Sequence, residues 1–244
     1  MLGRRHTMVE FSVEERLRSA ETVCRGLPAP FRLPDLEAMV HRTFAAEAIP
    51  GIVCAPKGPL PDGYVQLGVS FPFRYDGVRV RASFALPPSR IGRAHSPYDV
   101  AARLRPARFE AAAALLALRG LCDSLGIVVG LFGSAALQVL TGLPYLESTS
   151  DVDAVVRPRN CAALRSLHAG VAHLRIEHGR KFDVEVTLPN GLGIKLDELM
   201  SSTATVLGRG IDGVHLLDKA TVMRALDQSE CSFRSDELIT TEEN

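Results

Sequence analysis

The sequence lacks an excess of either charge, and this absence limits its partners. Lysine and arginine together number 28 among 244 residues, and so do aspartate and glutamate. Proteins that grip long nucleic acids use an excess of basic side chains to displace counterions from the phosphates. The zero net charge therefore speaks against a nucleic-acid substrate, although it is compatible with a local basic patch.

Cysteine-based metal motifs and long apolar runs are also absent. The five cysteines form no CxxC pair and no Cys/His pairing at zinc-ligand spacing, so we expect reduced thiols in a cytoplasmic protein. No apolar stretch reaches the roughly 18 residues that a membrane-spanning helix needs, and residues 1–12 contain no apolar segment typical of a secretory signal. We therefore expect no membrane partner.

The first part of the chain is rich in proline and glycine, which separate short periodic segments. Residues 64–70 and 77–86 alternate apolar and polar side chains, which predicts half-buried strands. Residues 35–48 have helical spacing, with Asp35 as the expected N-cap. These elements predict a small α+β domain over residues 1–97.

Residues 98–244 predict a second domain, in which helices alternate with strands. The expected helices lie at 109–126, 134–142 and 160–170, and the expected strands at 127–132, 150–156, 172–178, 182–188 and 192–196. Because 172–178 and 182–188 flank Gly179-Arg180-Lys181, we expect them to form a hairpin. The fold class is therefore α/β, with a mixed sheet and helices in this second domain.

Two aspartates stand two residues apart on the strand predicted at 150–156. Asp151 and Asp153 leave the same face of such a strand, while Val152, Ala154 and Val156 supply the opposite, buried face. Neighbouring carboxylates repel each other, and Mg²⁺ relieves this repulsion because it prefers carboxylate and phosphate oxygens. The pair predicts a magnesium site; the alternative is a solvated strand edge.

Gly133 and Ser134 lie where the strand at 127–132 gives way to the next helix. A helix N-terminus presents free backbone N–H groups and favours anions, and glycine lets a phosphate approach the main chain. The Ser134 hydroxyl adds a donor and can cap the helix. The two residues therefore predict a phosphate-binding turn, or, in the simpler interpretation, a helix cap alone.

A third carboxylate is expected on the strand at 182–188. Asp183 and Glu185 again share one face, and in a sheet beside 150–156 that face would meet the first acidic pair. Such a carboxylate accepts the proton of an attacking hydroxyl or holds a metal. We favour Asp183 over Glu185; the alternative is a surface hairpin of mixed charge.

These residues resemble the nucleotidyltransferase superfamily, whose members carry Gly-Ser, then Asp-x-Asp, then an acid on a later strand. The stretch GSAALQVLTGLPYLESTSDVDAVV (133–156) is similar to one member family, the malonate decarboxylase holo-acyl-carrier-protein synthases or phosphoribosyl-dephospho-CoA transferases. The specific part is Q-x-L-T-G-x-x-Y-L, and 182–191 and 195–199 resemble later family segments. Two positions depart from the family pattern: Leu137 replaces a tryptophan, and Arg209 stands near a missing lysine.

The resemblance implies a nucleotidyltransferase-like second domain that transfers a prosthetic group. The implied donor is 2′-(5″-triphosphoribosyl)-3′-dephospho-CoA, the acceptor is a serine of the apo acyl-carrier subunit of malonate decarboxylase, and pyrophosphate leaves. Asp151 and Asp153 would hold Mg²⁺, Asp183 would serve the serine, and Gly133 with Ser134 would hold phosphates. Rival interpretations keep the acids but change the acceptor, or make the chain a silent triphosphate-binding module or an ordinary α/β domain.

Carrier proteins of this kind are acidic, so a local arginine cluster would speed their encounter with the enzyme. Candidate arginines lie in residues 74–81, 89–93 and 102–108, the last including Arg105 and Arg108. The alternative is that these arginines keep a linker and a strand edge soluble.

Overall fold

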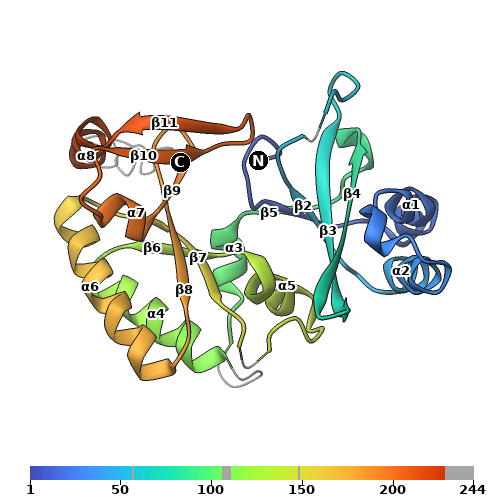
Figure 1. The fold of residues 1–244 in the computed structure, drawn as a ribbon, viewed down its shortest axis with the longest axis horizontal. Helices are drawn as coiled ribbons and strands as arrows, with labels where there is room; N and C mark the ends of the chain where they lie inside the picture. The colour runs from blue at the N-terminus through green and yellow to red at the C-terminus, as the bar shows by residue number, and fades with distance from the viewer. Residues whose placement is uncertain (57, 106–110, 148, 229–244) are drawn as a thin grey trace, which may run out of the picture. The chain divides into compact units, whose positions relative to one another are not determined.

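The computed structural model describes residues 1–244 apart from 57, 106–110, 148 and 229–244. The chain forms two compact units, the first from residues 1–104 and 131–147, the second from residues 105–130 and 148–244. The units interleave along the chain, and the domain boundary expected between residues 97 and 98 stays a prediction. Each unit has its own sheet and helices, which confirms the α/β fold class (Figure 1).

The first unit contains an antiparallel five-stranded sheet. Its strand order is β4-β3-β2-β1-β5, with β1 at Met8–Val9, β2 at Gly51–Val53, β3 at Val65–Tyr75, β4 at Val78–Leu86 and β5 at Ala94–His95. The two longest strands confirm those predicted at 64–70 and 77–86. They form a hairpin whose turn residues, Asp76 and Gly77, have φ angles of 48° and 71°, as a type I′ turn requires.

Two helices pack side by side in this unit, α1 at Val13–Arg25 and α2 at Pro34–Ala46, and α1 also contacts β4 (Figure 1). Three phenylalanine rings share the core here. The ring of Phe11 lies 5.8 Å from that of Phe44 and 5.9 Å from that of Phe84, and the latter two are 6.0 Å apart. This apolar cluster holds the helical pair and the sheet together.

The helix predicted at 35–48 is present as α2, but the prediction that Asp35 caps it is wrong. Leu33 occupies the N-cap position and Pro34 begins the helix. Proline is well suited to the first helical position because the N–H that it lacks would have no partner there. Asp35 lies in the first turn instead, where its negative charge interacts favourably with the helix dipole.

The remaining helical elements of the first unit are short. They are the 3-10 turns Ala29–Phe31 and Pro88–Arg90, α3 at Pro97–Ala102 and α5 at Gly133–Thr141. Helix α5 confirms the helix predicted at 134–142. It ends at Gly142, whose φ of 73° lies in the left-handed region that glycine adopts most readily.

The second unit contains a mixed six-stranded sheet of order β11-β10-β9-β8-β7-β6. Its strands are β6 at Val128–Leu131, β7 at Val152–Arg157, β8 at Phe182–Thr187, β9 at Gly193–Lys195, β10 at Thr205–Arg209 and β11 at Val214–Asp218. β7 and β8 are parallel, whereas the pairs from β8 to β11 are antiparallel. The mixed sheet expected for this part of the chain is confirmed.

The helices of the second unit are α4 at Ala112–Ser124, α6 at Cys161–His178, α7 at Leu196–Met200 and α8 at Lys219–Gln228. Helices α4 and α6 pack against each other along the sheet (Figure 1). In the part of the chain that the structure describes, no helix is both long and apolar enough to cross a membrane.

The hairpin predicted from 172–178 and 182–188 is wrong. Residues 172–178 belong to α6, which is longer than expected and ends at Gly179, with φ of 58°. Its buried side chains follow the helical period at Leu164, Leu167, Val171 and Leu174. Because β7 and β8 are parallel, the chain needs a long crossover between them, and α6 is that crossover.

Candidate functional site

The acidic residues singled out from the sequence meet on β7 and β8. In the parallel pair, Asp153 is in register with Asp183. Asp151 lies directly before β7, and the predicted buried face of that strand is confirmed, because Val152, Ala154 and Val156 are at most 1% exposed. One face of β7 therefore packs in the core, and the opposite face carries the aspartates.

Two lysines compensate part of this negative charge. The Lys181 ammonium lies 2.8 Å from Oδ2 of Asp151, and the Lys195 ammonium lies 2.9 and 2.7 Å from the two carboxylate oxygens of Asp183. Sequence reasoning assigned neither lysine a role. The sequence itself shows that Lys181 directly precedes the acidic strand β8. The position of Lys195, in contrast, depends on the antiparallel pairing of β8 with β9.

Asp153 is the electrostatically strained member of the group. Burial, then the neighbouring charges of Asp183 and Asp151, raise its pKa to about 7, and Lys181 and Lys195 offset this only in part. When a cation binds beside such a carboxyl, it stabilises the ionised form. This excess of negative charge is compatible with a hard divalent ion such as Mg²⁺, which Asp151 and Asp153 could hold.

Two carboxylates are an adequate protein contribution to such a site. Among the described residues, no group of three or more His, Cys, Asp or Glu side chains is arranged to hold a metal ion. Mg²⁺ is usually bound by one or two carboxylates together with substrate phosphates and water. A site with two carboxylates would therefore need a phosphorylated substrate to complete it.

Asp183 and Glu185 differ in their surroundings, although they lie two residues apart on β8. Asp183 is opposite Asp153, whereas Glu185 is opposite Val155 on one side and Lys195 on the other. The Glu185 side chain is also 5% exposed, compared with 22% for Asp183. Register and exposure therefore favour Asp183 as the carboxylate that reaches a substrate.

Gly133 and Ser134 belong to the first unit and begin α5. Gly133 has φ of 62°, a conformation that favours glycine, and the N-cap position falls on Phe132 without a side-chain hydrogen bond. The expectation that Ser134 caps the helix is therefore wrong, because the residue lies inside the first turn. Its hydroxyl and the free N–H groups of that turn are the donors that an anion would use.

The segment Q-x-L-T-G-x-x-Y-L forms a closed turn after α5. The Gln138 side-chain oxygen accepts hydrogen bonds from the backbone N–H groups of Tyr145, at 3.0 Å, and Leu146, at 2.7 Å. Tyr145 is fully buried, and its hydroxyl donates to the carbonyl of Ser70 at 2.8 Å. These contacts explain the fixed spacing of the motif: glutamine and tyrosine fold the chain back onto β3.

Comparison with known proteins identifies relatives over both parts of the chain. A family model described as phosphoribosyl-dephospho-CoA transferase MdcG C-terminal domain matches residues 99–220, and the corresponding N-terminal domain model matches residues 4–97. A phosphoribosyl-dephospho-CoA transferase of Xanthomonas campestris pv. campestris (strain 8004) is 28% identical over 198 residues, covering 80% of this chain and 90% of the relative.

Two further relatives carry the same name. The protein of Xanthomonas axonopodis pv. citri is 28% identical over 189 residues, covering 76% of this chain and 86% of the relative. That of Bradyrhizobium diazoefficiens is 30% identical over 162 residues, covering 66% of each chain. No solved structure shows significant similarity.

Proposed function

Because the chain belongs to the phosphoribosyl-dephospho-CoA transferase family, we propose that it attaches a dephospho-CoA-derived prosthetic group to a carrier protein. The donor is 2′-(5″-triphosphoribosyl)-3′-dephospho-CoA, and the acceptor is a serine of the apo acyl-carrier subunit of malonate decarboxylase. The serine oxygen bonds to the α-phosphorus, and the bond from that phosphorus to the bridging oxygen breaks. Pyrophosphate takes the electron pair of the broken bond, and the serine proton leaves.

The observation that carries this proposal is the register of Asp153 with Asp183, beside Asp151. Asp151 and Asp153 would hold Mg²⁺, which when bound neutralises charge on the triphosphate. Asp183 would accept the serine proton, and its contact with Lys195 keeps its carboxylate oriented. Gly133 and Ser134, which belong to the first unit, would donate hydrogen bonds to an anionic group. Catalysis in this scheme is positioning and charge neutralisation.

The acceptor is proposed on charge complementarity. Arg105 is exposed, and Arg108 lies outside the described residues. In the stretch 89–93, Arg90 is engaged by the buried Glu15 through bonds of 2.9 and 2.6 Å, whereas Arg93 is exposed. We propose that an acidic carrier meets the enzyme at 102–108.

Transfer of label from the triphosphoribosyl donor to the purified apo-carrier tests the proposal directly. We expect labelling of the carrier serine together with stoichiometric pyrophosphate, dependent on Mg²⁺ and lost on mutation of that serine to alanine. Label transfer to a small hydroxylated compound but not to the carrier would assign a different acceptor. The absence of any transfer, although triphosphate and Mg²⁺ raise the melting temperature, would leave a binding module.

A further inference from the structure

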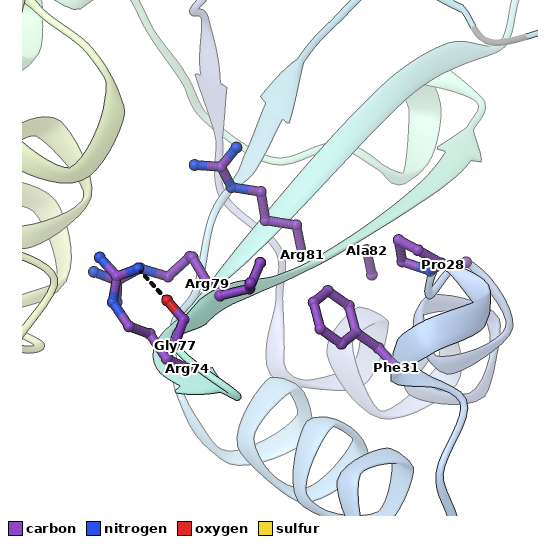
Figure 2. Close-up of a pocket in the computed structure, with 9 residues that line it drawn as sticks. Pro28, Phe31, Arg74, Gly77, Arg79, Arg81 and Ala82 are labelled. Atoms are coloured by element: carbon purple, nitrogen blue, oxygen red, sulfur yellow. Dashed lines mark hydrogen bonds between the residues drawn. The ribbon is translucent and has the colours of Figure 1, made fainter.

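A cavity lies within the first unit, along the outer edge of β4. It has a volume of about 570 Å³, within the range of small-molecule sites. The loop after α1 and the β3–β4 hairpin form its walls, with the lining residues Gly26, Pro28, Phe31, Arg74, Gly77, Val78, Arg79, Arg81 and Ala82 (Figure 2). Nothing in the proposed transfer reaction uses this cavity.

Three arginines concentrate positive charge in the cavity. The hairpin turn brings Arg74 opposite Arg79, and Arg81 follows two residues along β4. Glu147 pairs with the first two, its Oε1 lying 2.7 Å from Nε of Arg74 and 3.6 Å from a terminal nitrogen of Arg79. Arg81 is exposed, and its guanidinium group makes no hydrogen bond or ion pair with any described residue. This cluster therefore carries more positive charge than Glu147 neutralises.

Arg79 is a fixed wall of the cavity. It is 7% exposed, donates to the Tyr145 carbonyl at 2.6 Å, and lies 5.6 Å above the centre of the Tyr145 ring. Burial, then the positive charge of Arg74, lower its pKa, with Arg81 adding to the effect. The guanidinium is thus held in place before any ligand arrives, and an anion nearby would relieve the repulsion among the arginines.

The opposite wall of the cavity is apolar. Figure 2 shows Phe31 facing the β-hairpin, with Pro28 and Ala82 beside it and the guanidinium groups of Arg74 and Arg79 on the other side. The Phe31 ring meets the Tyr75 ring edge-on, with centroids 6.5 Å apart. A ring system can therefore lie against one wall while an anionic group reaches the other.

We propose that this cavity binds a nucleotide, with its base against Phe31 and its phosphate oxygens at Arg74 and Arg81. A folded carrier protein fits less well, because Arg79 is buried in the wall of the cavity, where a flat protein surface does not reach it. Arginine suits phosphate because its planar fork donates two parallel hydrogen bonds. The inference rests on the first unit alone and stands independently of the proposed transfer reaction.

The absence of tryptophan from the chain permits a direct test. In the full-length Phe31→Trp variant, the single tryptophan reports on the cavity, and EDTA suppresses any metal-dependent triphosphate site. We expect ADP to change its emission saturably and inorganic pyrophosphate to reverse the change. Adding Arg81→Ala should weaken ADP binding at least tenfold, whereas Arg42→Ala, an exposed arginine of α2 outside the cavity, should not.

Two controls keep the test decisive. The Tyr64→Trp variant places the reporter at a side chain that is 40% exposed and does not line the cavity, and its emission should not respond to ADP. Isothermal titration of wild-type protein with ADP in EDTA covers the case in which Phe31→Trp fails to fold. Titration with dephospho-CoA distinguishes a free nucleotide from one within a larger cofactor. The proposal is overturned if ADP does not bind at millimolar concentration, if Arg81→Ala leaves binding unchanged, or if adenosine binds as tightly as ADP.

Discussion

Asp153 and Asp183 occupy opposing positions on two parallel strands, so that their side chains leave the same face of one sheet. Lys195 holds Asp183 through both carboxylate oxygens, and no comparable pair holds Asp153 among the described residues. Asp153 therefore keeps the repulsion from its acidic neighbours, and its pKa is raised. Metal binding, the proton of the acceptor and the pH dependence of stability all depend on this relationship.

The pH dependence of folding should report on Asp153. Its folded-state pKa of about 7 lies above the ordinary value of 3.8, so between these values the folded protein holds a proton that the unfolded chain has released. The stabilising contribution is complete below about pH 4 and is lost as pH rises through 7, at about 1.4 kcal/mol for each pKa unit. Urea unfolding in EDTA should show this loss in the wild-type protein and not in Asp153→Asn. Parallel pH profiles for the two proteins would contradict it.

Neutralising either ligand aspartate should abolish transfer without unfolding the protein. Asp151→Asn and Asp153→Asn each remove one of the two expected Mg²⁺ ligands, and Asp153→Asn also relieves repulsion, so its melting temperature should be unchanged or higher above pH 7. Label transfer is measured at saturating Mg²⁺. The control is Asp123→Asn, in which the replaced side chain on α4 is 66% exposed. Near-normal turnover of either ligand variant would rule out the two-carboxylate site.

Ser134→Ala should affect the rate more than the stability. Because the N-cap of α5 lies at Phe132, we expect less than the roughly 1 kcal/mol that a lost cap usually costs. Loss of a donor to phosphate should slow transfer about tenfold or more. Ser12→Ala is the matched control: the Ser12 hydroxyl caps α1 at 3.1 Å, so this variant should lose stability and keep its rate. A rate unaffected by Ser134→Ala would remove that residue from the phosphate site.

The third carboxylate can be assigned by comparing two conservative variants. Asp183→Asn should lower kcat by about 10²-fold or more, the usual contribution of a positioned acid or base. Glu185→Gln should have a smaller effect on kcat, because Glu185 is opposite Val155 and 5% exposed. Single-turnover transfer separates the chemical step from product release. The reverse order of the two effects would make Glu185 the proton acceptor.

The encounter with the carrier should be electrostatic. Arg105→Glu combined with Arg108→Glu should slow transfer to the carrier while donor and Mg²⁺ binding stay unchanged. Wild-type transfer should also fall as salt rises, because the Debye length shrinks from about 10 Å at 0.1 M to about 3 Å at 1 M. Rates under subsaturating carrier measure this. Salt-independent transfer by a fully active double variant would place the carrier elsewhere on the surface.

Local patterns in the sequence were sufficient for several elements. The alternation around Asp153 predicted β7 and its buried face, and helix-forming residues followed by Gly142 predicted α5 and its end. Asp218 directly precedes α8, and its carboxylate accepts the N–H of Thr221 at 2.8 Å, as in a local helix cap. These features depend on neighbours along the chain, so periodicity and capping chemistry reveal them.

Tertiary structure decided the elements and side-chain positions that depend on residues far apart in the sequence. Residues 172–178 alternate like a strand, yet the parallel pairing of β7 with β8 requires a helix between them. That pairing also places Asp183, and not Glu185, opposite Asp153, and the β8–β9 pairing delivers Lys195. Likewise the sequence shows three arginines in residues 74–81, but only the turn at Asp76-Gly77 and the contact with Tyr145 make them the wall of a cavity. A one-residue change of register would send each of these side chains to the other face, which is why their placement cannot be read from the sequence alone.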